Sequence, residues 1–221
     1  MSTIFWDVDT QYDFMHADGK LYVPGAEEII PALARLTAYA HTHGIRVIAS
    51  ADDHVPQHDE LSDTPDFEDT YPPHCLRGTP GQRKIPETAL LDPLVIEPTP
   101  LDPVSLKRRV QAHTGDILFH KHWFDVFTNP NVEPVLEALD PGEIVVYGVA
   151  LDVCNRYAIE GLLRRRPRTR LCLVTDATKP IAADKAEALL ADWNARGVVL
   201  ISTDEALARS VGRRLKEPRT A

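Results

Sequence analysis

The sequence has 221 residues, of which 43% are hydrophobic, and its formal net charge is −9. This length supports one well-buried core rather than two, so we expect a single domain over residues 1–221. An acidic chain repels phosphate backbones, which argues against a nucleic-acid partner. No apolar run approaches the roughly 18–20 residues of a membrane span, and the first residues, MSTIFWDVDTQ, do not resemble a signal peptide. We therefore expect a cytoplasmic protein without a membrane partner.

Elements of two kinds alternate along most of the chain. Apolar runs predict strands at residues 3–8, 45–50, 117–121, 143–150, 170–177 and 198–202. Amphipathic stretches predict helices at residues 26–43, 131–139, 153–165, 182–196 and from about 204 onwards. Because Pro31 lies inside the first of these stretches, we expect its regular helix to begin only near that proline.

This alternation predicts right-handed crossovers and a mainly parallel sheet of six strands, covered by helices on both faces. The predicted fold class is therefore an α/β three-layer sandwich. Residues 51–116 are the exception, because they are rich in Pro, Asp, His and Thr and show little periodicity. We expect this stretch to be a long functional loop.

The three cysteines are Cys75, Cys154 and Cys172. An odd number of cysteines without a signal peptide argues against a disulfide framework, and no pair has the spacing of a thiolate zinc site. Cys154 follows the strand at 143–150 and opens the next helix, where the helix dipole stabilises a thiolate and unpaired N–H groups can hold an oxyanion. The alternative is a cysteine that is simply buried.

Two further reactive side chains stand at predicted strand ends. Asp9 follows the first strand and Lys121 ends the third. Because the carboxyl ends of adjacent parallel strands meet at one edge, Asp9, Lys121 and Cys154 are expected to converge. A carboxylate can take the thiol proton and return it to a leaving amine, and an ammonium group favours the thiolate. Taken singly, Asp9 could cap a loop and Lys121 could be a solvated charge.

Three motifs resemble a known family. VDTQYDF with Asp9, the strand-end Lys121, and GVALDVCNRYA with Cys154 resemble the isochorismatase-like cysteine hydrolases. The stretch TYPPHCLRGTPG, residues 70–81, is similar to nicotinamidases, also called pyrazinamidases. The resemblance extends from residue 4 to about 205. It implies an isochorismatase-like fold and a catalytic triad of Asp9, Lys121 and Cys154.

The resemblance also implies a reaction. Nicotinamide would be cleaved to nicotinic acid and ammonia through a thioester on Cys154, as a step of NAD salvage. A cis peptide at Val149–Ala150 would direct the Ala150 N–H, with that of Cys154, at the oxyanion. Members of such families often form homo-oligomers, so a homo-oligomer is an expectation here.

The segment after Lys121, HWFDVFTNPNV, is closer to the broader isochorismatase-like proteins, and residues 91–114 are longer than expected. Two alternatives therefore stay open. One is hydrolysis of another small amide or a ureido or carbamoyl compound. The other is a non-catalytic module that binds a metal or a ligand.

A metal site is predicted just after the second strand. Asp52 and His54 are spaced i, i+2, which puts both side chains on one face of an extended chain, and the loop would bring in His74. One carboxylate and two imidazoles suit Zn, Fe or Mn, and the same three residues match the metal ligands of nicotinamidases. In that family the metal binds the pyridine nitrogen. His58 is the better-placed candidate for a fourth ligand, and Asp63 is the alternative. The competing interpretation is that these histidines cap turns.

Aromatic side chains near these motifs could hold a planar substrate ring. The candidates are Phe14, Tyr71, Trp123 and Phe127. Core packing is the competing explanation, and it is equally favoured for Phe127.

Overall fold

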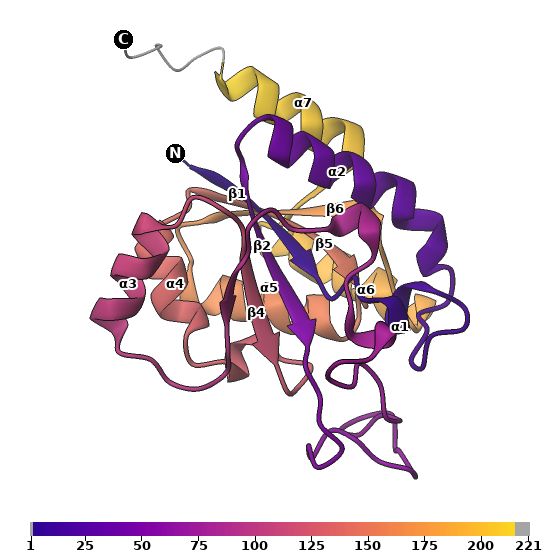
Figure 1. Cartoon of the computed structure of the whole chain (residues 1–221). Helices are drawn as coiled ribbons and strands as arrows, with labels where there is room; N and C mark the ends of the chain where they lie inside the picture. Colours follow the sequence, from indigo (N-terminus) through magenta and orange to yellow (C-terminus); the bar gives the residue numbers. More distant parts are fainter. Residues whose placement is uncertain (1, 215–221) are drawn as a thin grey trace.

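The computed structural model describes the backbone of residues 2–214 and the side chains up to residue 209. Its centre is a parallel sheet in the order β3-β4-β2-β1-β5-β6-β7 (Figure 1). The strands are β1 Thr3–Val8, β2 Arg46–Asp52, β3 Leu94–Ile96, β4 Ile117–Lys121, β5 Glu143–Val149, β6 Arg170–Lys179 and β7 Val199–Ile201. The predicted α/β class is confirmed, but the sheet has seven strands and not six.

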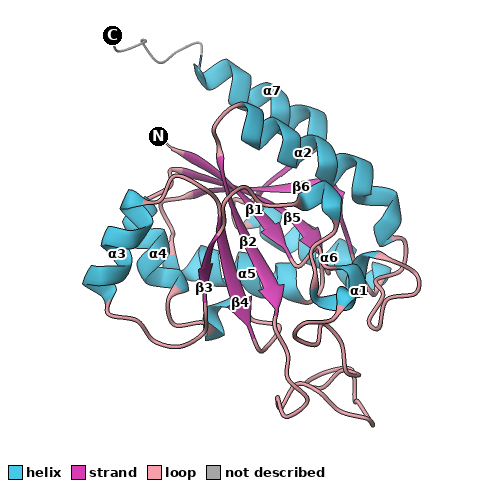
Figure 2. Ribbon diagram, viewed as in Figure 1, coloured by secondary structure: helices cyan, strands magenta, loops and turns pink. Residues whose placement is uncertain are grey.

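Helices cover both faces of the sheet (Figure 2). They are α1 Tyr12–Met15, α2 Ile30–Thr42, α3 Pro103–Ala112, α4 Val132–Leu139, α5 Cys154–Arg165, α6 Ala183–Ala195 and α7 Thr203–Arg214. Short 3-10 turns lie at Ala26–Ile29, Pro80–Gln82, Pro86–Thr88 and Val126–Thr128. No helix in the described part of the chain is long and apolar enough to cross a bilayer.

The side chains of each strand alternate between two apolar layers. On β1, Trp6 belongs to the layer that contains α3, α4, α5 and α6, whereas Phe5 belongs to the layer that contains α2 and α7. Both residues are fully buried. Burial on both faces explains why the strands appear in the sequence as continuous apolar runs rather than as alternating patterns.

The predicted helix start near Pro31 is confirmed, whereas the predicted loop over residues 51–116 is only partly correct. The regular helix α2 begins at Ile30, so Pro31 lies in its first turn, as predicted; a 3-10 turn precedes it. The prediction of one long loop over residues 51–116 is wrong in its second half. That half contains the edge strand β3 and the helix α3. β3 has only three residues, and α3 begins where the Asp102 side chain accepts a hydrogen bond from the Ser105 N–H.

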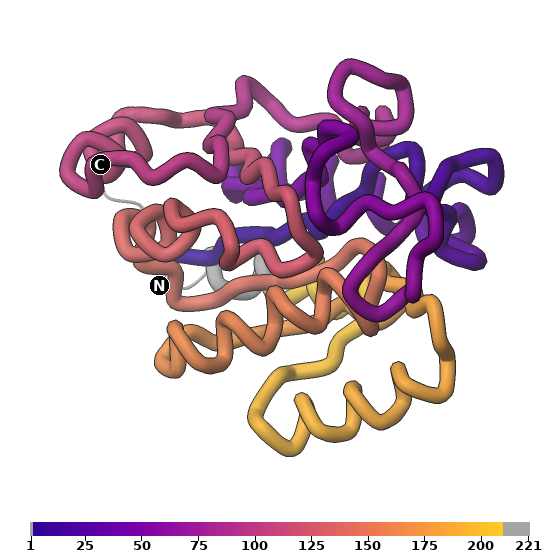
Figure 3. The backbone as a smooth tube through the Cα atoms, turned by 90° about the horizontal axis from the view of Figure 1, so that it is seen from below, coloured from indigo at the N-terminus to yellow at the C-terminus, as the bar shows by residue number. Residues whose placement is uncertain are grey.

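The segment that follows β2 projects beyond the carboxyl ends of the strands (Figure 1). Figure 3 views the molecule from that end and shows this purple segment in front. It folds back on itself through bridges between His54 and Leu76 and between Leu61 and Tyr71. Ligands of parallel α/β sheets bind at this edge, so the segment forms one wall of the region where a site is expected.

Candidate active site

Asp9, Lys121 and Cys154 meet at the carboxyl edge of the sheet. Lys121 Nζ lies 3.0 Å from Asp9 Oδ2 and 3.8 Å from Cys154 Sγ. Asp9 and Lys121 are fully buried, and 9% of Cys154 is exposed. The sheet order explains the convergence, because Asp9 follows β1, Lys121 ends β4, and Cys154 opens α5 directly after β5. The structure thus brings together the three predicted side chains.

Local backbone geometry aims the carboxylate of Asp9. The residue has a φ of 50°, a left-handed conformation that Asp tolerates better than most residues, and it turns the chain sharply after β1. Ser50, on the neighbouring β2, donates a hydrogen bond of 2.6 Å from Oγ to Asp9 Oδ1. The second oxygen, Oδ2, therefore faces Lys121.

Burial and charge compete at each of these groups. Burial disfavours the charge on Lys121, yet Asp52 and Asp9 hold the pKa of its ammonium well above the ordinary value. Burial raises the pKa of Asp9, and Lys121 only partly offsets this. Burial also raises the pKa of the Cys154 thiol far above the ordinary value, against the attraction of Lys121.

This pKa corrects one expectation about Cys154. The helix start is where it was predicted, but burial raises the pKa of the thiol, which favours the protonated sulfur over the thiolate. A hydrogen bond from the thiol to Asp9 lowers the pKa of Asp9. Asp9 is therefore placed to accept the thiol proton.

The predicted oxyanion region lies beside the sulfur. Cys154 is the first residue of α5, so its N–H has no acceptor within the helix. The Val149–Ala150 peptide is cis, and both Ala150 and Cys154 line the pocket. Asp152 accepts hydrogen bonds from the N–H groups of Ile181 and Ala182, which fixes the loop after β6 against the same pocket.

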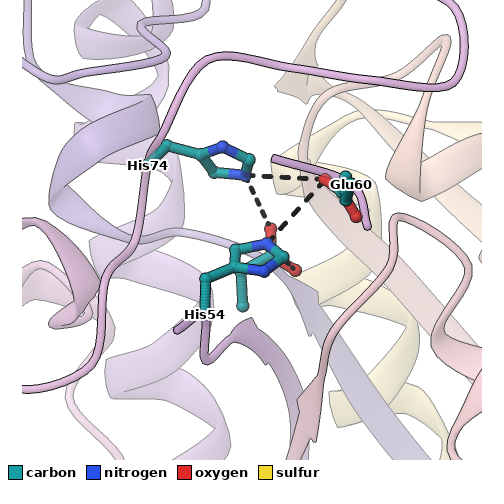
Figure 4. A group of neighbouring side chains, drawn as sticks. His54, Glu60 and His74 are labelled. Carbon is teal, nitrogen blue, oxygen red and sulfur yellow. Dashed lines mark ion pairs between the residues drawn. The ribbon is translucent and has the colours of Figure 1, made fainter. Parts of the chain in front are cut away.

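A second cluster lies directly beside Lys121. Asp52, His54, Glu60 and His74 are all buried, and one ligand atom of each lies within 4.8 Å of the others. His54 Nε2 and His74 Nε2 lie 3.8 and 3.6 Å from Glu60 Oε1, and 3.8 and 3.6 Å from the oxygens of Asp52 (Figure 4). Asp52 also contacts Lys121 Nζ through Oδ1, so the two clusters share one carboxylate.

The donor atoms of this cluster fit a divalent metal. Both Nε2 atoms and Glu60 Oε2 are buried without a hydrogen-bond partner, which is costly unless something binds there. The Pro72 carbonyl only accepts, so His74 Nδ1 carries the proton and its Nε2 offers a lone pair. His58 Nδ1 accepts from the Val55 N–H, so His54 Nδ1 donates to it at 3.2 Å, and His54 Nε2 is also a lone-pair donor.

The fourth residue of the cluster differs from the predicted metal ligand. It is Glu60, whereas His58 lies behind His54 on its Nδ1 side, and Asp63 is exposed and outside the cluster. The reason is the path of the loop, because the Leu61–Tyr71 bridge turns Glu60 inward. Two histidines and two carboxylates remain a set that suits Zn, Fe or Mn.

Burial and neighbouring charges shift the pKa values of the groups in this cluster. Burial and the nearby Asp52 carboxylate raise the pKa of Glu60 to about 8. Burial lowers the pKa of His54 to about 3. Burial alone would raise the pKa of Asp52, but the ammonium of Lys121 holds it well below its ordinary value. A divalent cation would relieve the repulsion between the two carboxylates.

Two of the four predicted aromatic residues line the pocket at Cys154. They are Phe14 and Tyr71. Trp123 and Phe127 do not line it: Trp123 packs on Phe124, and the Phe127 ring lies against Gly161. The aromatic pocket residue that the sequence reasoning missed is Phe124, which lies between them in the sequence.

Two further polar residues support the site and were not predicted. Ser50 orients Asp9, as described above. The Gln11 amide clamps β1 to β2: its nitrogen donates to the Asp52 carbonyl at 2.8 Å, and its oxygen accepts from the Asp52 N–H at 2.7 Å. Gln11 lies in the motif with Asp9 and is fully buried, so a polar residue three positions past a strand end was the available signal.

Comparison with known protein families shows which family this chain belongs to. The family model of the isochorismatase domain matches residues 4–103 and 102–205. The chain belongs to the isochorismatase family. Among curated members, a nicotinamidase/pyrazinamidase of Mycobacterium tuberculosis is 29% identical over 197 residues, which is 88% of this chain and 95% of that protein.

Solved structures share the isochorismatase-family fold. A pyrazinamidase of Pyrococcus horikoshii in complex with zinc has a TM-score of 0.69 at 20% identity, covering 91% of this chain and 99% of that one. An N-carbamoylsarcosine amidase of Thermoplasma acidophilum has a TM-score of 0.67 at 21% identity, covering 92% and 98%. At these identities the likeness concerns the fold, so the substrate must be argued from the site.

Proposed function

We propose that this isochorismatase-family protein is a cysteine amidohydrolase that cleaves nicotinamide to nicotinic acid and ammonia. The observation that carries the proposal is the buried contact of Lys121 with both Asp9 and Cys154, beside a pocket. The 29% identity to a nicotinamidase/pyrazinamidase supports the choice of substrate.

The first half of the reaction forms a thioester. Asp9 accepts the thiol proton, and the Cys154 sulfur attacks the amide carbonyl carbon. Lys121 stabilises the charge on the sulfur from 3.8 Å. The N–H groups of Ala150 and Cys154 would hold the oxyanion, and losing one such donor typically costs about 10²–10³ in rate. Asp9 then gives its proton to the leaving nitrogen, and ammonia departs.

The second half regenerates the enzyme. Asp9, ionised again, takes a proton from water, which attacks the thioester carbon. The C–S bond breaks, the acid leaves, and the proton returns to the sulfur. A cation held by Asp52, His54, Glu60 and His74 would supply a Lewis acid that accepts a ring-nitrogen lone pair. The proton transfers of both halves run between Asp9, Cys154, the substrate and water.

The pocket lining favours a neutral ring over a charged carbamoyl compound. Besides Phe14, Tyr71 and Phe124, it includes the apolar side chains of Leu21, Val23, Val149, Val153 and Ile181. None of the described lining residues is Arg or Lys, so no cation of the lining matches the carboxylate of an N-carbamoyl amino acid. Flat apolar walls with a few polar groups at one end suit a pyridine carboxamide.

Ammonia release from a panel of amides tests the proposal. Metal-loaded wild-type protein should hydrolyse nicotinamide and pyrazinamide, and should hydrolyse N-carbamoyl amino acids far more slowly. Preference for the carbamoyl compounds would contradict nicotinamide as the substrate but would still be consistent with hydrolysis by Cys154. No turnover of any amide would support a non-catalytic module instead.

A further inference from the structure

A second group of metal-capable side chains lies outside the active site. Asp53, Glu97 and His120 place one ligand atom each within 4.8 Å of one another. They come from the ends of three adjacent strands, β2, β3 and β4. None of them has a role in the proposed reaction.

The strand register explains why these residues share one face. Ile96 pairs with Phe119 and Ala51 with His120, so Glu97 follows level with His120, and Asp53 lies two residues beyond Ala51. Residues two apart on a strand point to the same side. Asp52 and Lys121, which pair with each other, point to the active site, so their sequence neighbours point away from it.

His122 lies beside this group, near Asp53, and is the further side chain that could supply a fourth donor. Asp53 Oδ2 lies 3.8 Å from His120 Nδ1 and 3.9 Å from His122 Nε2, and His120 Nδ1 lies 3.0 Å from Glu97 Oε1. Tetrahedral zinc with bonds of about 2.0–2.1 Å separates its ligand atoms by about 3.4 Å, so Asp53, Glu97 and His120 need only small adjustments. The His122 ring would have to turn towards Glu97 and His120 to join them. His122 Nε2 is moreover a buried atom without a hydrogen-bond partner.

Hydrogen bonds from two neighbouring side chains fix the carboxylate of Asp53. Arg77 donates from Nε to both oxygens of Asp53 at 3.0 Å, and Gln82 donates to Oδ1 at 2.5 Å. Such outer contacts orient metal ligands. Arg77 offsets one of the two carboxylate charges of Asp53 and Glu97, so one negative charge remains for a cation.

We propose that Asp53, Glu97, His120 and His122 form a second site for a divalent transition cation of the zinc class. It would link the ends of β2, β3 and β4 on the side of Lys121 that faces away from the pocket. Two imidazoles and two carboxylates are borderline-hard donors, which select Zn or Co over Ca and Mg. This site is independent of the amidohydrolase proposal, because none of its residues contacts the substrate pocket.

Calorimetric titration of the metal-free chain with Zn²⁺ tests the site. The wild-type protein should bind two Zn²⁺ per chain, and the H120A/H122A double variant should bind one. Glu97→Gln should weaken the second binding step by about tenfold or more. His43→Ala, which changes a histidine near the amino end of β2, at the other end of the strands, should still bind two. His74→Ala should retain binding at the second site.

Co²⁺ absorption provides a second readout that does not depend on activity. In the His74→Ala variant, d–d bands should appear on Co²⁺ addition and should vanish when H120A/H122A is added to that background. One Zn²⁺ per wild-type chain would overturn the proposal, as would two Zn²⁺ in H120A/H122A. In those cases His120 and Glu97 form an ion pair only. Glu97 is 55% exposed in its side chain, so its variant tests the site without disturbing the core.

Discussion

Lys121 Nζ lies 3.0 Å from Asp9 Oδ2, and both side chains are completely buried. Lys121 also contacts Asp52. One ammonium group therefore neutralises two buried carboxylates and approaches the sulfur of Cys154. Its removal affects stability as well as catalysis.

We predict that Lys121→Met abolishes amide hydrolysis and lowers the free energy of unfolding of the metal-free protein by about 3–5 kcal/mol, because two carboxylates lose their buried partner. In K121M/D9N only one carboxylate remains unpaired, so this double variant should be more stable than K121M. Urea denaturation measures both. An unchanged stability of K121M, or a double variant no more stable than the single one, would contradict this account of Lys121.

The pH dependence of kcat/KM depends on Asp9, which must be ionised to accept the thiol proton. Burial raises the pKa of Asp9, so activity should be lost, as pH falls, at a value above the ordinary pKa of about 3.9. The hydrogen bond from Ser50 favours the ionised form. Ser50→Ala should therefore move the acid limb to higher pH by about one unit. Ser105→Ala, on an exposed helix, is the matched control and should leave the profile unchanged.

Metal affinity at the Asp52, His54, Glu60 and His74 cluster should rise with pH up to about 8. Burial and the carboxylate of Asp52 raise the pKa of Glu60 to about 8, so below that pH a cation must displace its proton. Calorimetry in buffers of different ionisation enthalpy counts these protons. Glu60→Gln should release one proton fewer near pH 7 and bind at least about tenfold more weakly. Asp63→Asn should behave as wild type; a loss of affinity in that variant would reassign the fourth ligand.

Phe124 and Phe127 allow a matched comparison between pocket and core. Phe124→Ala should lower kcat/KM for nicotinamide by about tenfold, because the substrate ring loses an aromatic wall. Phe127→Ala should leave KM unchanged and lower the free energy of unfolding by up to about 3 kcal/mol, because the ring packs on Gly161. Steady-state kinetics and urea denaturation of both variants separate the two roles. The reverse pattern would contradict the pocket described here.

The sequence predicts the parts of the fold that carry long apolar runs. Strands β1, β2, β4 and β5 and the helix start at Cys154 are where the periodicity indicates, and the order of these strands places Asp9, Lys121 and Cys154 together. β3 was not predicted because its three apolar residues stand between Pro93 and Pro98, in a stretch rich in Pro and Asp that shows no periodicity. α3 did have a signal, since Asp102 followed by Pro103 is typical of a capped helix start.

The metal loop could be predicted only in part. Asp52 and His54 follow from an extended chain after a strand, where spacing determines the side-chain direction. Glu60 could not be distinguished from His58, because the Leu61–Tyr71 bridge sets the path of the loop and has no periodic pattern in the sequence. The choice of Phe124 over Phe127 likewise depends on a short 3-10 turn.

Acid quenching of the wild-type protein during turnover of nicotinamide, followed by intact-mass and peptide mass spectrometry, tests the central claim most directly. The account predicts an added mass equal to the acyl part of the substrate on the peptide that contains Cys154, and neither adduct nor ammonia release in Cys154→Ala. Cys75→Ala should still form the adduct. Ammonia release by Cys154→Ala at the wild-type rate, or an adduct located on another residue, would contradict the account.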